Sequence, residues 1–207
     1  MWFDIASAFV TFFVVLDPIG VALVGGNLTR GMPAELRRSI AWRGTLIAAL
    51  LMLIFAFGGA ALLQALGITL PALRVAGGLL LFLLSVDMVF ARPSGIRNPT
   101  GPEQAEASHR SDVAVFPLAF PLLAGPGALT TVVLLMGRAT DPMHMVMVIA
   151  AMLAVLAVAL AALLAADRVN RLLGVTGANV VSRVLGVILA ALAAQFVLDG
   201  IAQGLRQ

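Results

Sequence analysis

The sequence has no cysteine and no lysine, and it has only two histidines. The lack of cysteine excludes disulfide bonds and thiolate metal sites. The lack of lysine excludes a phosphate-binding loop of the Walker type, which needs a lysine beside the phosphates. His109 and His144 both fall outside the apolar segments, so no paired-histidine zinc motif exists. No arginine run is interleaved with aromatic residues, as nucleic-acid binding would require. We therefore expect no enzyme activity, no cofactor, no metal and no nucleic-acid partner.

Charged residues are also scarce, at 11% of the chain, whereas 61% of the residues are hydrophobic. The mean hydropathy is +1.07. Ordinary soluble domains are about 45–50% apolar, and a soluble domain of this size could not hide so much apolar surface. Lipid must cover the excess, so the composition predicts an integral membrane protein whose first partner is the lipid bilayer.

Six apolar segments are long enough to span a bilayer, which takes about 20 residues as a helix. They lie at roughly 4–27, 44–66, 71–91, 113–137, 143–166 and 181–203. Their even spacing predicts a single all-α membrane domain over residues 1–207. Within it we expect one repeat at about 1–91, a polar cytoplasmic loop at about 92–112 and a second repeat at about 113–203.

The arginines predict the orientation of the chain, because cytoplasmic loops of membrane proteins carry an excess of basic residues. All 13 basic residues are arginine, and ten of them fall on one side of the predicted membrane. Those ten are Arg30, Arg37, Arg38, Arg43, Arg92, Arg97, Arg110, Arg168, Arg171 and Arg183, against Arg74, Arg138 and Arg206 on the other side. The first group is assigned to connectors or helix starts in the cytoplasm, which leaves both termini outside it.

The two halves of the chain share sequence features at matching positions. Pro18 interrupts the first apolar segment and Pro126 interrupts the fourth, 108 residues later. Arg74 and Arg183 open the third and sixth segments at nearly the same offset, 109 residues. Since each half holds an odd number of spans, the repeats must have inverted topology. Inverted repeats with matched broken helices are typical of secondary transporters.

The two interruptions predict a substrate site. Proline lacks an N–H and disturbs a helix, and freed backbone groups are tolerated in hydrocarbon only where protein or a water-filled cavity satisfies them. The half-helices that follow would aim positive N-terminal ends into such a cavity, which suits a carboxylate. The alternative is a pair of proline kinks with packing roles only. The predicted substrate-binding residues are Asp17, Pro18, Gly20, Gly125, Pro126, Gly127 and Thr130.

Several charged residues fall in or near the apolar segments, where a charge costs roughly 2.5–3.5 kcal/mol on insertion scales. Asp17 is a candidate proton carrier or contact for a substrate amine, or a cap on the following half-helix. Asp87, Arg74 and Arg183 are candidates for coupling or gating. The alternatives are pairing of Asp87 with Arg92, and snorkelling of the two arginines to the interface.

Segments 44–66 and 143–166 contain almost no polar residues, so we expect them to be scaffold that faces lipid, with the other four helices around the cavity. Small residues recur in the last segment, and such residues let membrane helices approach closely. They are Gly186, Ala190, Ala194 and Gly200.

Several segments resemble the MarC family of membrane proteins. The string VFPLAFPLLAGPGA at residues 115–128 resembles the family's helix-4 signature, and DPIG at 17–20 resembles its helix-1 motif, in which Asn often replaces Asp17. Residues 74–78, 179–186 and 195–201 resemble the openings of helices 3 and 6 and the closing segment. The resemblance implies a six-helix inner-membrane protein related to the LysE-type amino acid exporters. Some members are described as transporters of small neutral amino acids such as glycine and alanine.

From the broken helices and this resemblance we expect a multi-pass protein of the bacterial inner membrane that transports small neutral amino acids by alternating access. A proton or another cation is a candidate coupling ion. The alternatives are an exporter of another small metabolite or drug, and a membrane scaffold that transports nothing. The direction of transport and the oligomeric state are left open.

Overall fold

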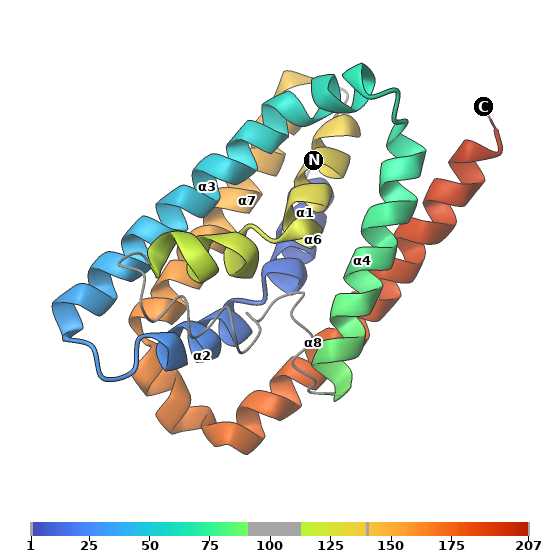
Figure 1. The fold of residues 1–207 in the computed structure, drawn as a ribbon. Coiled ribbons are helices and arrows are strands. Elements are labelled where there is room, and N and C mark those ends of the chain that lie inside the picture. The colour runs from blue at the N-terminus through green and yellow to red at the C-terminus, as the bar shows by residue number, and fades with distance from the viewer. Residues whose placement is uncertain (1, 91–112, 140, 207) are drawn as a thin grey trace.

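The computed structural model describes residues 2–90, 113–139 and 141–206, and every regular element in those ranges is a helix (Figure 1). The elements are α1 (Trp2–Leu16), α2 (Pro18–Leu28), α3 (Ala34–Ala65), α4 (Leu70–Phe90), η1 (Ala114–Leu123), α6 (Pro126–Gly137), α7 (Pro142–Leu164) and α8 (Ala166–Gly204). The predicted polar loop at about 92–112 lies outside the described residues.

Five segments of the described chain are long and apolar enough to cross a membrane. They are Ile5–Leu28, Ala34–Ala65, Leu70–Phe90, Pro142–Leu164 and Asn179–Gly204. A sixth is obtained when η1 and α6, which bend by 55° at their junction, are counted as one span. These helices confirm the all-helical membrane fold that the composition predicts.

α3 begins at Ala34 rather than near residue 44, so the prediction that Arg37, Arg38 and Arg43 lie in a connector is wrong. Pro33 precedes the helix with φ −55°, which suits a helix start, and good helix formers follow. The helix has 32 residues, which makes it about 48 Å long. Because the hydrocarbon core is only about 30 Å thick, the polar first turns can stay helical outside it.

α8 begins at Ala166 and only Ala165 separates it from the end of α7, so Arg168 and Arg171 are also helical rather than in a connector. The helix turns at Gly174, which has φ 58° and ψ −176°, a conformation that is accessible to glycine because it has no Cβ. The predicted start of the last span near residue 181 is therefore only the apolar continuation of a longer, bent helix.

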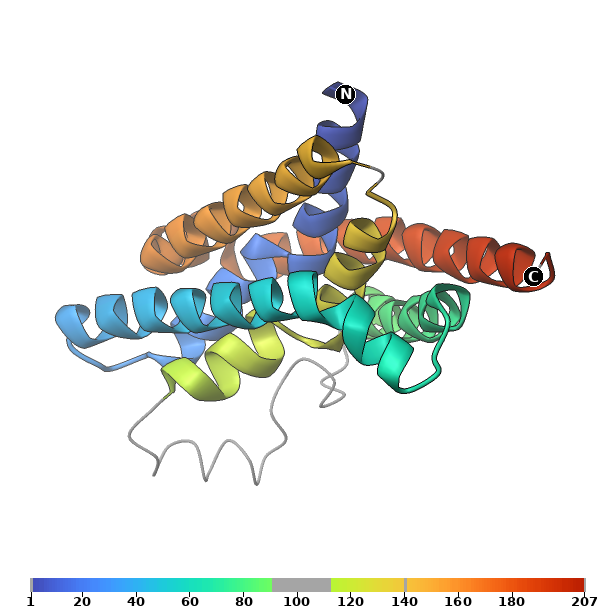
Figure 2. The same ribbon diagram turned by 90° about the horizontal axis from the view of Figure 1, so that it is seen from above.

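The second helix of each half packs against the interrupted span of the other half. α3 lies against η1 and α6, whereas α7 lies against α1 and α2 (Figure 2). Glycines allow this close approach: a Cβ at Gly25 would meet Leu163 at 2.4 Å, and a Cβ at Gly59 would meet Val133 at 2.4 Å. The interrupted spans thus form the centre of the molecule.

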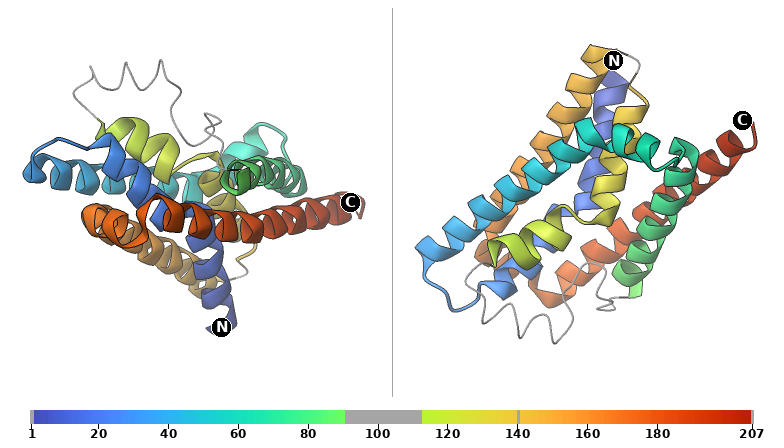
Figure 3. Two further views of the ribbon diagram at one scale, coloured as in Figure 1. Left: turned by 90° about the horizontal axis from the view of Figure 1, so that it is seen from below. Right: turned by 45° about the horizontal axis from the view of Figure 1, so that its top comes forward.

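α4 and α8 run side by side over most of the length of α4 (Figures 1 and 3). Gly186 contacts Met88, and Gly200 contacts the backbone of Pro71, so these two small residues do allow close packing as predicted. Ala194, however, is exposed, and its neighbour Ala193 is buried in this interface instead.

Both termini lie at one end of the molecule (Figures 1 and 3). We name this the termini end, and Arg74, Arg138 and Arg206 lie toward it. The α2–α3 connection and the α7–α8 junction lie at the other end, which we name the arginine-rich end. Its described arginines include Arg30, Arg37, Arg38, Arg168 and Arg171.

Candidate functional site

The first interruption is a single residue, Asp17, between α1 and α2. Asp17 has φ 44° and ψ 71°, a left-handed conformation that Asp and Asn adopt more readily than most residues. Its Oδ1 accepts a hydrogen bond of 3.0 Å from the N–H of Gly20, and the residue is only 2% exposed. A Cβ at Gly20 would collide with this carboxylate. Asp17 therefore caps α2, and glycine at position 20 leaves room for the cap.

The second interruption separates η1 from α6. Gly125 precedes α6 in an extended conformation, with φ −69° and ψ 170°. Pro126 is the first residue of the helix, and the N-cap residue Gly125 makes no side-chain hydrogen bond to the first N–H groups. Because α2 already has a carboxylate at its N-terminus and α6 has none, the two half-helices differ in their capacity to bind an anion.

A small cavity of about 20 Å³ adjoins this second interruption. It brings together three of the predicted binding residues, Gly125, Pro126 and Gly127. Asp17, Pro18 and Gly20 are not among its lining residues, although Val15 is. The remaining walls are apolar: Leu80, Leu84, Pro121, Leu122, Leu123 and Ala128. A volume of this size has room for roughly one water molecule.

Thr130, the last predicted binding residue, lies against α4 rather than in this cavity. Its methyl group fills the space beside Gly77, and its hydroxyl donates a 2.8 Å hydrogen bond to the carbonyl of Pro126. Threonine hydroxyls inside helices commonly bond one turn back in this way. The prediction that it binds substrate stays a prediction.

A larger cavity, of about 360 Å³, opens at the arginine-rich end. Its lining comes from α2, α3, η1, α7 and α8: Gly25, Thr29, Ala34, Arg37, Arg38, Ile40, Ala41, Leu118, Leu163, Leu164 and Asp167. The prediction that segment 143–166 only faces lipid is therefore wrong in part, since Leu163 and Leu164 of α7 border this cavity. The lining residues of α3 all lie before residue 44, so the prediction for segment 44–66 stays a prediction.

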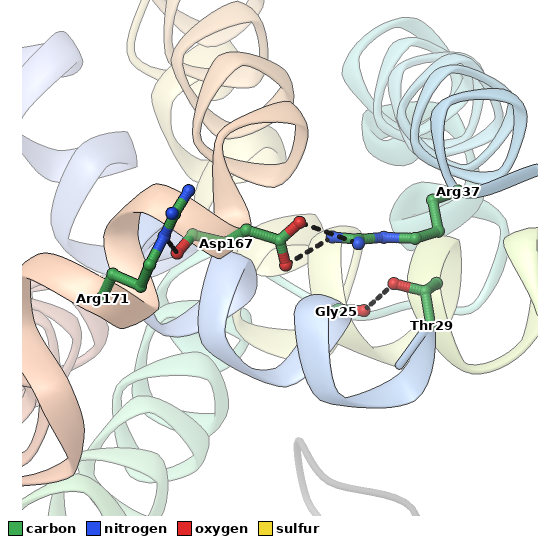
Figure 4. Close-up of polar contacts among 5 residues, drawn as sticks. All are labelled: Gly25, Thr29, Arg37, Asp167 and Arg171. Carbon is green, nitrogen blue, oxygen red and sulfur yellow. Dashed lines mark hydrogen bonds and ion pairs between the residues drawn. The ribbon is translucent and has the colours of Figure 1, made fainter. Parts of the chain in front are cut away.

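An ion pair borders this cavity (Figure 4). Arg37 of α3 donates from Nη1 and Nη2 to the two carboxylate oxygens of Asp167 on α8, at 2.8 and 2.9 Å. Nε of Arg171 donates to the backbone carbonyl of Asp167 at 3.3 Å. The hydroxyl of Thr29 donates to the carbonyl of Gly25 at 2.8 Å. The cavity thus presents both a guanidinium and a carboxylate.

The hydrogen bonds from Arg37 lower the pKa of Asp167 below its ordinary value. Asp167 is 65% exposed and Arg37 is 24% exposed, so water screens the pair and its contribution to stability is small. The Arg37–Asp167 ion pair can therefore break and re-form with little change in the stability of the fold.

Sequence analysis missed this cavity because Arg37 and Asp167 are 130 residues apart and each looked like an ordinary interfacial charge. The available signal was Asp167 itself, an acid in a cluster of basic residues directly after an apolar span.

The three predicted gating residues do not come together. Asp87 is half-buried near the C-terminal end of α4, whereas Arg74 lies near its N-terminal end, about 20 Å away along the helix axis. Arg183 is exposed on α8. Arg74 is 4% exposed and lies in the field of Arg138 and Asp199. Those two residues form an ion pair of 3.0 Å at the termini end.

Comparison with known proteins decides the family. The sequence pattern of the "MarC family integral membrane protein" matches residues 2–205. The chain belongs to the MarC family of integral membrane proteins. Among the relatives of this MarC chain, the UPF0056 membrane protein of Archaeoglobus fulgidus is 38% identical over 201 residues, which cover 96% of this chain and 92% of the relative.

Two bacterial proteins show the same full-length similarity to this MarC chain. The UPF0056 inner membrane protein YhgN of Escherichia coli is 35% identical over 199 residues, or 96% of each chain. The UPF0056 membrane protein YvbG of Bacillus subtilis is 30% identical over 193 residues, 93% of this chain and 92% of the relative. No solved structure matches.

Proposed function

We propose that this MarC protein is a secondary transporter of small neutral amino acids that works by alternating access, and that it is not an enzyme. The observation that carries the proposal is the pair of interrupted helical spans at the centre of the fold. Membrane proteins keep non-helical backbone only where protein buries it or where it lines a water-filled cavity. In secondary transporters such breaks, matched in the two halves, form the sites for substrate and coupling ions.

The packing supports two inverted repeats. α3 packs against the interrupted span of the second half, and α7 packs against that of the first half. α4 packs against α6, and α8 packs against α2, in the same reciprocal manner. An exchange of this kind is the pattern that a two-fold axis in the membrane plane produces, because that axis carries each helix onto its counterpart in the other half.

The charges along the path favour a zwitterion. The cavity at the arginine-rich end offers Arg37 and Asp167, which complement a carboxylate and an ammonium group. Deeper in the protein, the uncapped N-terminus of α6 at Gly125–Gly127 suits the carboxylate. Asp17, two residues beyond the cavity-lining Val15 and bonded through Oδ1 to the Gly20 N–H, is our candidate contact for the amine. A small side chain is required, since the cavity beside Gly127 has only about 20 Å³ and its walls include four leucines.

The cavity of about 210 Å³ that Pro126 and Thr130 border is otherwise lined by apolar residues of α3, α4 and α6. The cavities therefore support a conformation whose polar opening lies toward the arginine-rich end. About 360 Å³ is accessible there, against about 20 Å³ beside Gly127. An amino acid needs more room than one water molecule, so loading the inner site requires α4 and α6 to separate. Leu81 of α4 lies directly over Gly127, and it is the side chain that must move.

We place the protein in the inner membrane, as the name of its relative YhgN states for that protein. The arginine-rich end faces the cytoplasm in this proposal, because basic residues are retained there. Both termini would then lie outside the cytoplasm.

The proposal is tested by uptake of labelled glycine, alanine and other amino acids into liposomes that contain the purified protein, with protein-free liposomes as the control. Saturable uptake of the small neutral amino acids, and much less of large or charged ones, is expected. Uptake of none of them by correctly folded protein would refute the proposal and favour export of another metabolite or a scaffold role.

A further inference from the structure

Arg74 is a buried cation, and two of its nitrogen atoms lack hydrogen-bond partners among the described residues. It is 4% exposed, and neither its Nε nor its Nη1 has a hydrogen-bond partner among the residues that the structure describes. Leaving a charge buried and unpaired is costly. A charged residue kept at such a position inside a membrane protein usually serves binding or transport.

The position of Arg74 follows from the register between α4 and α6. Leu70 contacts Gly137, Gly77 contacts Thr130 and Leu81 contacts Gly127, so the two helices are antiparallel. Arg74 is one turn before Gly77 on the same face of α4 and therefore points toward α6. Long side chains lean toward the N-terminus of their helix, which takes the guanidinium toward the termini end.

The acid whose charge acts on this guanidinium, Asp199, already has partners. Oδ2 of Asp199 accepts from Arg138 at 3.0 Å, and its Oδ1 accepts from Gln195 at 2.7 Å. The group of Arg74, Arg138 and Asp199 therefore carries one uncompensated positive charge. Asp199 and Arg138 are 31% and 41% exposed, so their ion pair is less buried than Arg74.

We propose that Arg74 binds the carboxylate of the transported amino acid when the path opens toward the termini end. This inference rests on the proposed function and adds a second binding site for the substrate carboxylate along the transport path. Arg74 lies about 10 Å beyond Gly127 along α6, in the direction of the termini end. A guanidinium binds a carboxylate through two parallel hydrogen bonds, either from Nη1 and Nη2 or from Nε and Nη2. The unpartnered Nη1 and Nε of Arg74 each supply one donor of such a pair. Breaking the Arg138–Asp199 pair gives access to it.

The test compares Arg74→Gln and Arg74→Lys with the wild-type protein in lipid nanodiscs, and Arg206→Gln is the control for loss of an exposed arginine at the same end. Thermal unfolding is measured alone and with sodium acetate, glycine, glycinamide hydrochloride or sodium chloride. Glycinamide has the amine but no carboxylate, and chloride is an anion without the carboxylate geometry.

Without ligand, Arg74→Gln should unfold at the wild-type temperature or higher, because it removes an unpaired buried charge. Acetate and glycine should stabilise the wild-type and Arg206→Gln proteins, whereas glycinamide and chloride should not. In Arg74→Gln the apparent Kd for acetate should rise roughly 10- to 100-fold, as expected for loss of a charge-assisted hydrogen bond. Arg74→Lys should fall between the two.

Three results would overturn the proposal. A large loss of stability in Arg74→Gln, with acetate binding retained, would make Arg74 a structural residue. Acetate binding of wild-type strength in a stable Arg74→Gln protein would place the carboxylate elsewhere, at the N-terminus of α6. Equal stabilisation by chloride would mean a site for inorganic anions. If liposomes take up no amino acid but acetate binding still depends on Arg74, the proposed substrate is refuted and the assignment of a carboxylate site to Arg74 is retained.

Discussion

Asp17 offers a direct way to separate capping from proton transfer, because asparagine can replace one role and not the other. Asn accepts a hydrogen bond at a helix N-terminus as well as Asp does and also tolerates the left-handed conformation that Asp17 adopts, with φ 44°. We expect Asp17→Asn to leave stability within about 0.5 kcal/mol of wild type. Alanine supplies neither property.

The cost of Asp17→Ala follows from two features of the break. Loss of the 3.0 Å bond to the Gly20 N–H costs about 1 kcal/mol, and an ordinary Cβ in the left-handed region costs roughly 1–2 kcal/mol. The sum, about 2–3 kcal/mol, lowers the melting temperature by roughly 5–10 °C for a chain of this size. Gly20→Ala should be similarly destabilising, since the new methyl would collide with the Asp17 carboxylate.

The assay is thermal unfolding of the variants in one detergent, followed by uptake in liposomes with and without a pH gradient. If Asp17 only caps α2, Asp17→Asn should transport with an unchanged response to the gradient. Loss of that response in a stable Asp17→Asn protein would make Asp17 the proton carrier. Equal stability of Asp17→Ala and wild type would refute the capping argument itself.

Gly127→Ala should reduce transport severely, because its Cβ would lie 2.6 Å from Leu81, and Leu81→Ala should restore part of it; no rescue would mean that this contact does not gate the site. Arg37→Gln removes the donor that lowers the pKa of Asp167, so the stabilising effect of the pair is present at neutral pH and lost as pH falls through that lowered pKa. Melting curves of the two proteins should differ at pH 7 and converge in acid, whereas a gap independent of pH would contradict the ion pair. Finally, a reporter that works only in the cytoplasm should be silent at either terminus, and a signal at one of them would contradict the proposed orientation.

The sequence predicted the spans and the two interruptions because these depend on local properties. Apolar length defines a membrane helix, and proline with flanking glycine weakens it at Pro18 and Pro126 wherever the chain folds. The start of α3 was predicted too late because polar residues at Arg37 and Arg38 can either leave the helix or extend it beyond the lipid. Hydropathy does not distinguish these outcomes.

The candidate site was harder to predict because it depends on contacts between distant segments. The pairing of Arg37 with Asp167 requires the first turns of α3 and α8 to meet, and the packing of α7 on α2 and α3 brings them together. The burial of Arg74 depends in the same way on α6 and α8. Its sequence position, near the end of an apolar span, is equally compatible with an arginine that snorkels to the surface.

The reciprocal packing of the two halves also has a consequence for biosynthesis. α1 and α2 are buried against α7, which begins at Pro142, more than 110 residues after α2 ends at Leu28. At translation rates of about 5–20 residues per second, the first interrupted span waits roughly 6–23 s in the membrane before its partner is made. During that interval α7 is not yet present to pack against α1 and α2, between which Asp17 lies. Newly inserted chains therefore need the translocon, lipid headgroups or a chaperone beside the first three helices until the second half arrives.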